Sequence, residues 1–414
     1  MIADRGGAQR ALETLTLALP LVSAGRDTAL VAPLATAGWA RAVTAAARRA
    51  GAEVRVEPVL SADFVGLTVE CVGGRHGMPV RAVPDWIAAV AEPWRNEPRE
   101  QADEAALRDA KRACLAGLTT DERWSSGVLR ALFGPHHRYG LVHDERVARI
   151  AGCEAEDLRP VTRDLLTGPP VVALSLADPA DEEAVRDALA TAGRHPGQPG
   201  HPGVLPAAPR SPLPGQRPVA LSLPGGRDTA YHLLGTPGVS LGSPDKFAVH
   251  MAWAMLGGRE GMFGRRLREG RALTYSLAAF SREFAEAGYG VCMAVCRPGA
   301  LREVADRTAA VLGDLAEGRF ERALVASAKE RLVIQNHRAL QSGRDVTRRL
   351  CGYEIAGLPA ADLVAYADRI GRVTGEQVRD VARRRLCIDE GGDEQGERTD
   401  GTTGVAVPGQ EHGR

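Results

Sequence analysis

"RIAGCEAEDLRPVTRDLL", Arg149 to Leu166, reappears late in the chain as "RIGRVTGEQVRDVARRRL", Arg369 to Leu386. The two stretches align without a gap. The identical positions are Arg149/Arg369, Ile150/Ile370, Glu156/Glu376, Arg159/Arg379, Val161/Val381, Arg163/Arg383 and Leu166/Leu386. Self-similarity at a fixed interval indicates a repeated structural unit. We therefore expect one half of the chain to be a copy of the other.

The order of segments around this repeat is also kept. Ala110-Lys111 in "LRDAKRACLAG" corresponds to Ala328-Lys329 in "VASAKERLVIQ", and "GRDTA" starts at both Gly25 and Gly226. Alternating stretches typical of strands come first in each half and helical patterns follow. The expected strands are 14–22, 27–35, 53–60, 64–72 and 169–177, then 218–225, 229–235, 273–280, 288–296 and 403–409, with helices at 100–118 and 321–343. This order predicts an α+β fold of two duplicated α/β sandwich domains, each an antiparallel sheet flanked by helices.

A segment rich in proline and glycine separates the two halves. The proline and glycine content of residues 194–218 is incompatible with both a helix and a sheet ladder, so this segment is predicted to be a semi-extended linker. The predicted domains are residues 1–193 and 219–409, and the acidic, polar stretch 389–403 is expected to be a loop within the second.

Composition excludes several classes of function. The chain has 414 residues, and its 52 Lys and Arg balance 52 Asp and Glu, so no overall field would gather nucleic acid or an anionic membrane. We found no signal-peptide pattern and no uninterrupted apolar run long enough for a membrane span, which predicts a cytoplasmic protein. The 7 cysteines are scattered, which is not typical of a disulfide framework.

The second half resembles a known family. The run from His250 to Phe320, containing "FGRRLREGRALTYS" and "GYGVCMAVCRPGALREV", together with "ALVASAKERL", resembles the C-terminal domain of the M16 metallopeptidases, the insulinase and mitochondrial processing peptidase group. In the first half "FGPHHRYG" and "RIAGCEAEDL" resemble that family's "HPYG" loop and the helix after it. The resemblance covers about residues 10–388, is looser in the first half, and implies a LuxS/MPP-like fold.

The zinc motif of this family is missing. Active members hold zinc through His-x-x-Glu-His on a helix of the first domain, where the glutamate activates the metal-bound water. None of the 10 histidines here forms that motif in either direction. The chain runs from "TALVAPLATAG" into "WARAVTAAARRAG", so the ligand-bearing helix is either absent or rebuilt without ligands. We expect no metal in this chain and no peptidase activity from it alone, with zinc supplied by a partner subunit.

One pair of residues still matches residues that act on the substrate in this family. Where the family forms two-subunit enzymes, the subunit without zinc supplies an arginine and a tyrosine seven apart, which match Arg268 and Tyr275. Both are hydrogen-bond donors that could hold a scissile carbonyl and stabilise the oxyanion formed from it. The alternative is structural: Arg268 pairs with Glu269 or Glu283 while Tyr275 packs at the start of a strand.

A short glycine turn precedes this pair. Gly257 and Gly258 stand where the noncatalytic subunit of the mitochondrial enzyme carries a longer substrate loop. A simple turn between helices is the favoured interpretation, and guiding of substrate is the alternative.

The remaining histidines and cysteines favour ordinary structural roles. His136, His137 and His143 lie on a loop bounded by Gly and Pro, without a carboxylate at helical spacing, so loop structure is favoured over a metal site. His250 and His337 fit satisfied or exposed helix positions better than catalytic bases. Cys292 and Cys296 fall on one face of an alternating strand, which favours buried packing over metal binding.

The resemblance implies an M16B-type noncatalytic subunit in a heterodimer with a subunit that bears His-x-x-Glu-His. Such a chain would bind the peptide substrate and complete the active site. Its Ala- and Arg-rich composition suggests a GC-rich bacterial genome, in which such pairs often resemble proteases that remove the leader from a ribosomally made, modified peptide. Two alternatives remain open: a scaffold subunit without chemistry, and a stand-alone peptide-binding module of the same fold. None of the three predicts nucleic acid or a membrane as a partner.

Overall fold

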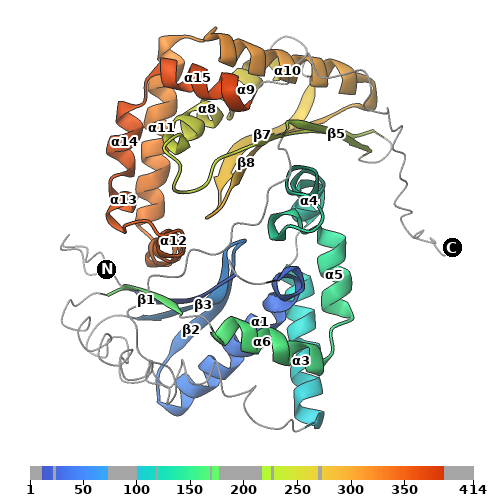
Figure 1. Cartoon of the computed structure of the whole chain (residues 1–414), viewed down its shortest axis with the longest axis vertical. Coiled ribbons are helices and arrows are strands. Elements are labelled where there is room, and N and C mark those ends of the chain that lie inside the picture. The colour runs from blue at the N-terminus through green and yellow to red at the C-terminus, as the bar shows by residue number, and fades with distance from the viewer. Residues whose placement is uncertain are drawn as a thin grey trace, which may run out of the picture.

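The protein is stacked in two halves along its long axis (Figure 1). The computed structural model describes residues 12–21, 25–72, 100–117, 120–167, 170–176, 217–224, 228–268 and 273–386. Each half contains a four-stranded antiparallel sheet, with strand order β2-β3-β1-β4 in the first and β5-β6-β8-β7 in the second. The predicted α+β fold with two antiparallel sheets and flanking helices is therefore confirmed. The limits of the domains and their origin by duplication stay predictions.

The elements of the first half are β1 (Leu12–Pro20), α1 (Arg26–Arg49), β2 (Val54–Leu60), β3 (Phe64–Val72), α3 (Glu100–Gly117), α4 (Thr120–Phe133), the 3-10 turn η3 (Arg138–Gly140), α5 (His143–Ala151), α6 (Ala155–Thr167) and β4 (Val171–Ser175). Those of the second half are β5 (Val219–Pro224), β6 (Ala230–Pro237), α8 (Lys246–Leu256), α9 (Met262–Arg268), β7 (Thr274–Glu283), β8 (Gly288–Cys296), η4 (Pro298–Ala300), α10 (Leu301–Glu317), α11 (Arg322–Leu340), α12 (Gly343–Ile355), α13 (Ala361–Val364), α14 (Tyr366–Arg372) and α15 (Gly375–Arg385). The linker 194–216 and the expected strand 403–409 lie outside the described residues.

Residues 27–35 form the start of helix α1, so the predicted strand at this position is wrong. The run from Thr28 to Thr36 is buried on every side, because α1 packs against the first sheet as well as α3, α5 and α6. An apolar run without a polar face has no periodicity that separates a buried strand from a buried helix. The alanines that continue to Ala47 favour helix, and they extend α1 to Arg49.

α1 is also the one helix, within the described part of the chain, that is long and apolar enough to cross a membrane. Its most apolar window has a mean hydropathy of 1.2, and 67% of that window is buried inside the protein. Its neighbours within the fold therefore account for its composition.

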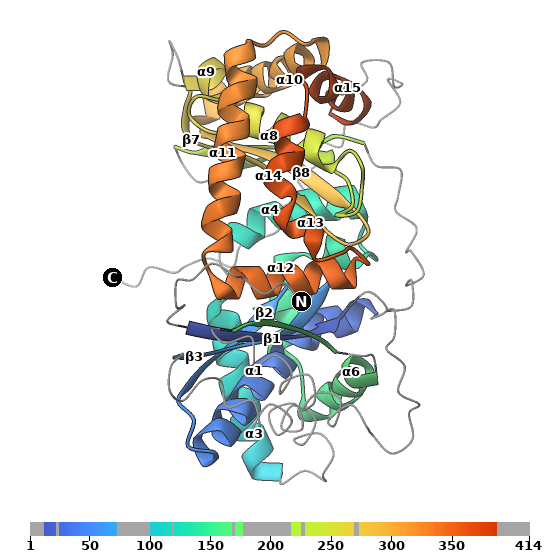
Figure 2. The ribbon, with the colours of Figure 1, turned by 90° about the vertical axis from the view of Figure 1, so that its left-hand side faces the viewer.

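The first sheet is covered on one face by a helix from the other half. Leu15, Leu17 and Leu19 of β1 alternate toward α1, whereas the residues between them face α12, which crosses this sheet near β1 and β4 (Figure 2). The Thr16 hydroxyl meets the Thr347 hydroxyl of α12 at 2.7 Å. The first half therefore needs a helix that begins at Gly343 to complete its packing.

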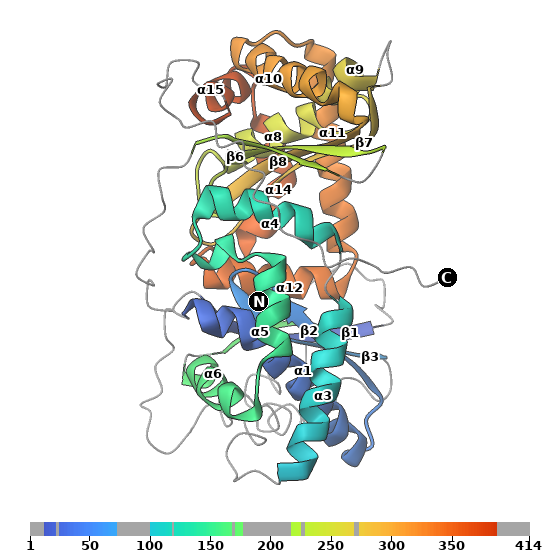
Figure 3. The ribbon, with the colours of Figure 1, turned by 90° about the vertical axis from the view of Figure 1, so that its right-hand side faces the viewer.

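The second sheet is covered in the reciprocal way. α4 of the first half lies under β5 and β6 (Figure 3), where Val128, Leu132 and Phe133 pack with Leu233 and Val291. The opposite face of this sheet packs against α8 and α10. The halves thus exchange one helix each, and neither sheet is covered by its own half alone.

Close packing in the second half can be tested with two glycines. A Cβ at Gly290 of β8 would lie 2.0 Å from the indole of Trp253, whereas one at Gly313 of α10 meets nothing within 4 Å. Trp253 is 2% exposed and cannot move aside without disturbing the core. Gly290→Ala should lower the free energy of unfolding by about 1–3 kcal/mol, and Gly313→Ala should raise it by about 0.5–1 kcal/mol.

Urea denaturation followed by circular dichroism measures both values. Equal and small effects of the two substitutions would contradict the packing of β8 against α8.

Candidate functional site

The turn between α9 and β7 brings the two predicted site residues to one corner of the second half. Arg268 is the last residue of α9, and Tyr275 is the second residue of β7. The backbone N–H of Leu273 donates to the carbonyl of Leu267 at 3.1 Å, which ties the end of the helix to the start of the strand. Gly270, the expected end of the helix, lies outside the described residues.

Tyr275 lies at a break in the ladder between β7 and β8. The register shifts between Thr274 and Ser276, so Tyr275 is the extra residue of a β-bulge, a feature that often re-aims a side chain at a sheet edge. The residue is 56% exposed. Packing of Tyr275 at the start of the strand, which was one structural alternative, is therefore wrong.

Glu283 lies at the far end of β7 and has partners of its own. It ends β7, nine residues beyond its first residue, which is about 30 Å along an extended strand. Its carboxylate meets Nε2 of His250 at 2.5 Å, and Nδ1 of that ring meets the Tyr366 hydroxyl at 2.9 Å. This confirms His250 as a satisfied helix residue, but the roles of Arg268 and Tyr275 stay a prediction.

The glycine turn before α9 has clear packing reasons for its sequence. A Cβ at Gly257 would lie 2.5 Å from the carbonyl oxygen of Ala279 in β7, and Gly258 has a φ of +81°. The first glycine allows α8 to end against the edge strand, and the second allows a left-handed backbone. These contacts agree with a structural turn and leave its role toward substrate a prediction.

Helix α1 contains the run from "TALVAPLATAG" into "WARAVTAAARR", where the resemblance led us to expect a helix that is absent or rebuilt without zinc ligands. Between Arg26 and Arg49 the sequence contains no His, Cys or Glu. Pro33 lies inside the helix and has no N–H to donate to the carbonyl of Ala29. The carbonyl of Pro33 itself accepts from the Cys114 thiol at 3.2 Å and from the Thr36 hydroxyl at 2.8 Å.

A cavity of about 810 Å³ opens between α1 and the second half. Its floor comes from Ala29, Pro33 and Ala37 of α1, and its opposite wall comes from Phe280 and Arg282 of β7. Helix α1 therefore borders this cavity with small apolar side chains. Within the described ranges, no group of three or more His, Cys, Asp or Glu side chains is placed to hold a metal ion.

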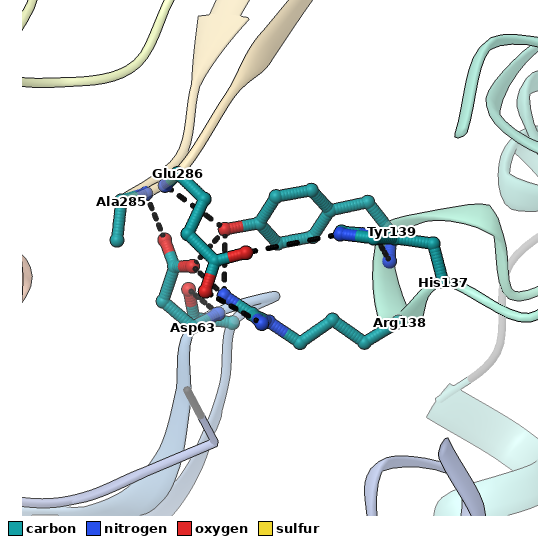
Figure 4. A network of polar contacts seen from close by, with 7 residues as sticks. Asp63, His137, Arg138, Tyr139, Ala285 and Glu286 are labelled. Atoms are coloured by element: carbon teal, nitrogen blue, oxygen red, sulfur yellow. Dashed lines mark hydrogen bonds and ion pairs between the residues drawn. The ribbon is translucent and has the colours of Figure 1, made fainter. Parts of the chain in front are cut away.

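Beside this cavity, a cluster of buried polar residues joins the two halves (Figure 4). Asp63, in the turn between β2 and β3, accepts a hydrogen bond from the Tyr139 hydroxyl, and its other oxygen accepts from the backbone N–H of Ala285 at 2.8 Å. Arg138 donates to Asp63 at 3.4 Å and to Glu286 at 3.1 Å. We call Asp63, Arg138, Tyr139 and Glu286 the Asp63 cluster.

The environment of the Asp63 cluster shifts the protonation of its neighbours. Burial, and then the charge of Asp63, raises the pKa of Tyr139 far above its usual range, so the phenol stays a donor. Burial, and then the Arg138 guanidinium, lowers the pKa of His137 below 6.5. His137 accepts from the backbone N–H of Tyr139 at 3.1 Å, so the loop interpretation of this histidine is confirmed.

Sequence reasoning identified the loop of this cluster but missed its acidic partners. Asp63 and Glu286 both lie in turns between strands, where acidic residues are ordinary, and they are far apart in the chain. The other expected structural roles are confirmed, because His337 is exposed and both Cys292 and Cys296 are fully buried free thiols.

Comparison with known proteins identifies the fold to which this architecture is similar. The chain has the two-sheet α+β fold of M16 metallopeptidase-like proteins, as the following solved structures show. It is similar to the peptidase M16 inactive domain from Pseudomonas fluorescens (17% identity over 92% of this chain and 91% of that chain, TM-score 0.67). It is also similar to a protease from Helicobacter pylori (12% identity over 92% of this chain and 93% of that chain, TM-score 0.68). A third similar structure is a chain of complex III from Candida albicans with Inz-5 bound (15% identity over 91% of this chain and 88% of that chain, TM-score 0.67).

A family model also matches part of the chain. Residues 181–332 match the model described as the Peptidase M16 inactive domain, so this part of the chain is similar to a domain of that type. No curated protein matches the chain. The similarity to solved structures, at these identities, establishes the fold and leaves activity to be proposed.

The absence of zinc ligands from α1 gives a direct prediction. The chain, purified alone after growth with zinc and dialysed against a weak chelator, should contain far less than one zinc per chain by inductively coupled plasma mass spectrometry. One zinc per chain retained after dialysis would contradict this prediction.

The lowered pKa of His137 gives a second prediction, on pH. The unfolded chain takes up the proton first as the pH falls below about 6.5, so the folded state loses stability toward acid by at most about 1.4 kcal/mol per pH unit for this group. His137→Asn keeps an acceptor for the N–H of Tyr139 but cannot titrate. Urea denaturation between pH 7 and 5 should show a weaker loss of stability for His137→Asn than for wild type.

His136 is exposed on the same loop, and His136→Asn provides the matched control, which should follow the wild-type curve. An His137→Asn curve parallel to that of wild type would show that this ring does not couple folding to pH.

Proposed function

We propose that this chain is the noncatalytic subunit of a heterodimeric zinc metallopeptidase of the M16 type. The observation that carries the proposal is helix α1, which lies against the first sheet of an M16-like fold but has no His, Cys or Glu. Water activation by zinc then has to come from a partner subunit that bears His-x-x-Glu-His. The two halves would have arisen by duplication, and the complex would work in the cytoplasm.

Arg268 and Tyr275 would complete the active site from this side. Their common corner is held by the backbone bond between Leu273 and Leu267, and Tyr275 is largely exposed. An exposed phenol and a guanidinium can both donate to a substrate carbonyl in the partner's site. Such donors stabilise the charge that develops on the carbonyl oxygen during attack by zinc-bound water.

The proposed substrate is a peptide bound in an extended conformation. β7 is an edge strand among the described elements, so a peptide can add to it through main-chain hydrogen bonds. Gly257 and Gly258 lie beside β7, where they could guide it. Removal of a leader sequence from a ribosomally made, modified peptide is the expected process, and it rests on analogy of fold.

A scaffold role is the second candidate. It is favoured by the similarity to a chain of complex III, a large assembly. A scaffold would require interaction surfaces but no donors at the corner of α9 and β7. A stand-alone peptide-binding module is the third candidate, and it would need no partner at all.

The test is co-expression of this chain with an M16 subunit that bears His-x-x-Glu-His, followed by peptidase assays of each protein and of the complex. Arg268→Ala and Tyr275→Phe should each leave the complex intact by size-exclusion chromatography. Each should lower kcat by about 100- to 1,000-fold, because a donor to the oxyanion is lost.

Arg266→Ala is the matched control, because Arg266 lies on the same helix but bonds to Asp314 at 3.0 Å. Its activity should equal that of the wild-type complex. Full activity of both Arg268→Ala and Tyr275→Phe would favour the scaffold, and full activity of the zinc subunit alone would exclude the proposed shared site.

A further inference from the structure

The cavity between α1 and β7 has a charge pattern that selects its occupant. Its described lining contains Arg138, Arg146, Arg282 and His143 but no Asp or Glu. The charge of Arg138 is balanced by Asp63 and Glu286 behind the wall. Arg282 therefore leaves its part of the lining positive, and this disfavours a cationic ligand there, since like charges brought together in a partly buried site repel each other.

Apart from Ser61 and Ser126, the rest of the lining is apolar and aromatic. Aliphatic side chains come from the first half, and aromatic rings come from both halves: Leu21, Val65, Leu141, Ile150, Tyr139, Phe280, Phe284 and Tyr289. Leu60, at the end of edge strand β2, is 52% exposed beside them. The volume of about 810 Å³ falls within the ~300–1,000 Å³ typical of ligand sites.

β7 supplies both the cationic and the aromatic group of one wall. Phe280 and Arg282 are two residues apart on this strand, so their side chains project from the same face, and the guanidinium lies 5.9 Å from the ring centroid. No ion pair to Arg282 occurs among the described residues, and the residue is exposed. Arg282 is thus available to a carboxylate without breaking another contact.

The free edge of the same strand offers backbone pairing. β7 pairs only with β8 in the described sheet, and α4 covers β5 and β6 instead of β7. A peptide that pairs with β7 would present alternate side chains to the wall that carries Phe280 and Arg282. A residue opposite Phe280 and another opposite Arg282 would then also be two apart.

We propose that this cavity and the open edge of β7 bind an extended peptide segment in which an Asp or Glu lies two residues from a large aliphatic or aromatic residue. The carboxylate pairs with Arg282, for which a guanidinium offers bidentate hydrogen bonds, and the apolar side chain enters the space floored by Pro33 and Ala37. The inference rests on the proposed peptide-binding role and adds a substrate class to it: acidic, apolar segments.

The test measures binding to the isolated full chain by fluorescence anisotropy. Three labelled heptapeptides are compared: one with Asp and Phe two residues apart, one with Lys in place of Asp, and one with Asp and Phe adjacent. The first should bind at least about tenfold more tightly than either of the others, which corresponds to about 1.4 kcal/mol, since both of the others lose the charge-assisted hydrogen bond to Arg282. Its affinity should also fall as salt is raised from 50 to 300 mM.

Two variants locate the binding. Arg282→Ala should weaken the Asp peptide about tenfold without affecting the Lys peptide, and Phe280→Ala should weaken both. Arg302→Ala is the control, because Arg302 is an exposed arginine on α10, outside the lining of the cavity. Thermal melting of each variant checks that the fold is kept.

The outcomes separate this inference from the proposed function. Equal binding of the Asp and Lys peptides, or no effect of Arg282→Ala, overturns the substrate class even if the complex with a zinc subunit is an active peptidase. Equal affinity for phenylpropionate alone would also overturn it, because the occupant would then be a small carboxylate. Selective binding of the Asp peptide supports the inference even if no zinc subunit gains activity.

Discussion

The two halves depend on each other through the buried carboxylate of Asp63. Tyr139, Arg138 and the backbone N–H of Ala285 all donate to it, so the first half supplies the anion, and donors arrive from a loop of the same half and a hairpin of the other. Removing one partner of such a set leaves another polar group buried without hydrogen bonds, which costs more than the bond itself contributes. The cluster thus fixes the distance between the sheets, and with it the shape of the cavity that lies alongside.

Much of the fold followed from local pattern. Alternation located every described strand, and the helical periodicities at 100–118 and 321–343 matched α3 and α11. The wrong prediction at residues 27–35 has a clear origin, because a segment buried on all sides lacks the contrast between polar and apolar faces that separates helix from strand. Pro33 added to the error, since proline inside a helix is uncommon.

The site was only partly predictable. The interval between Arg268 and Tyr275 located a corner of the second half, yet the bulge that exposes Tyr275 follows from strand register, which no local pattern reveals. The Asp63 cluster and the cavity combine residues from β2, α1, α5 and β7, whose separations in the chain are large. Packing of this kind is set by how the halves meet, so single stretches of sequence carry no signal for it.

The exchange of α4 and α12 has a consequence for how the protein is made. Strand β4 ends at Ser175, but the helix that covers Ala18, Phe64 and Ala173 ends only at Ile355. At about 5–20 residues per second, the ribosome needs roughly 9–36 s to synthesise the chain between these points. During that interval one face of the finished first sheet is bare, and its apolar part around Ala18, Phe64 and Ala173 is a surface that chaperones bind and that neighbouring nascent chains can join.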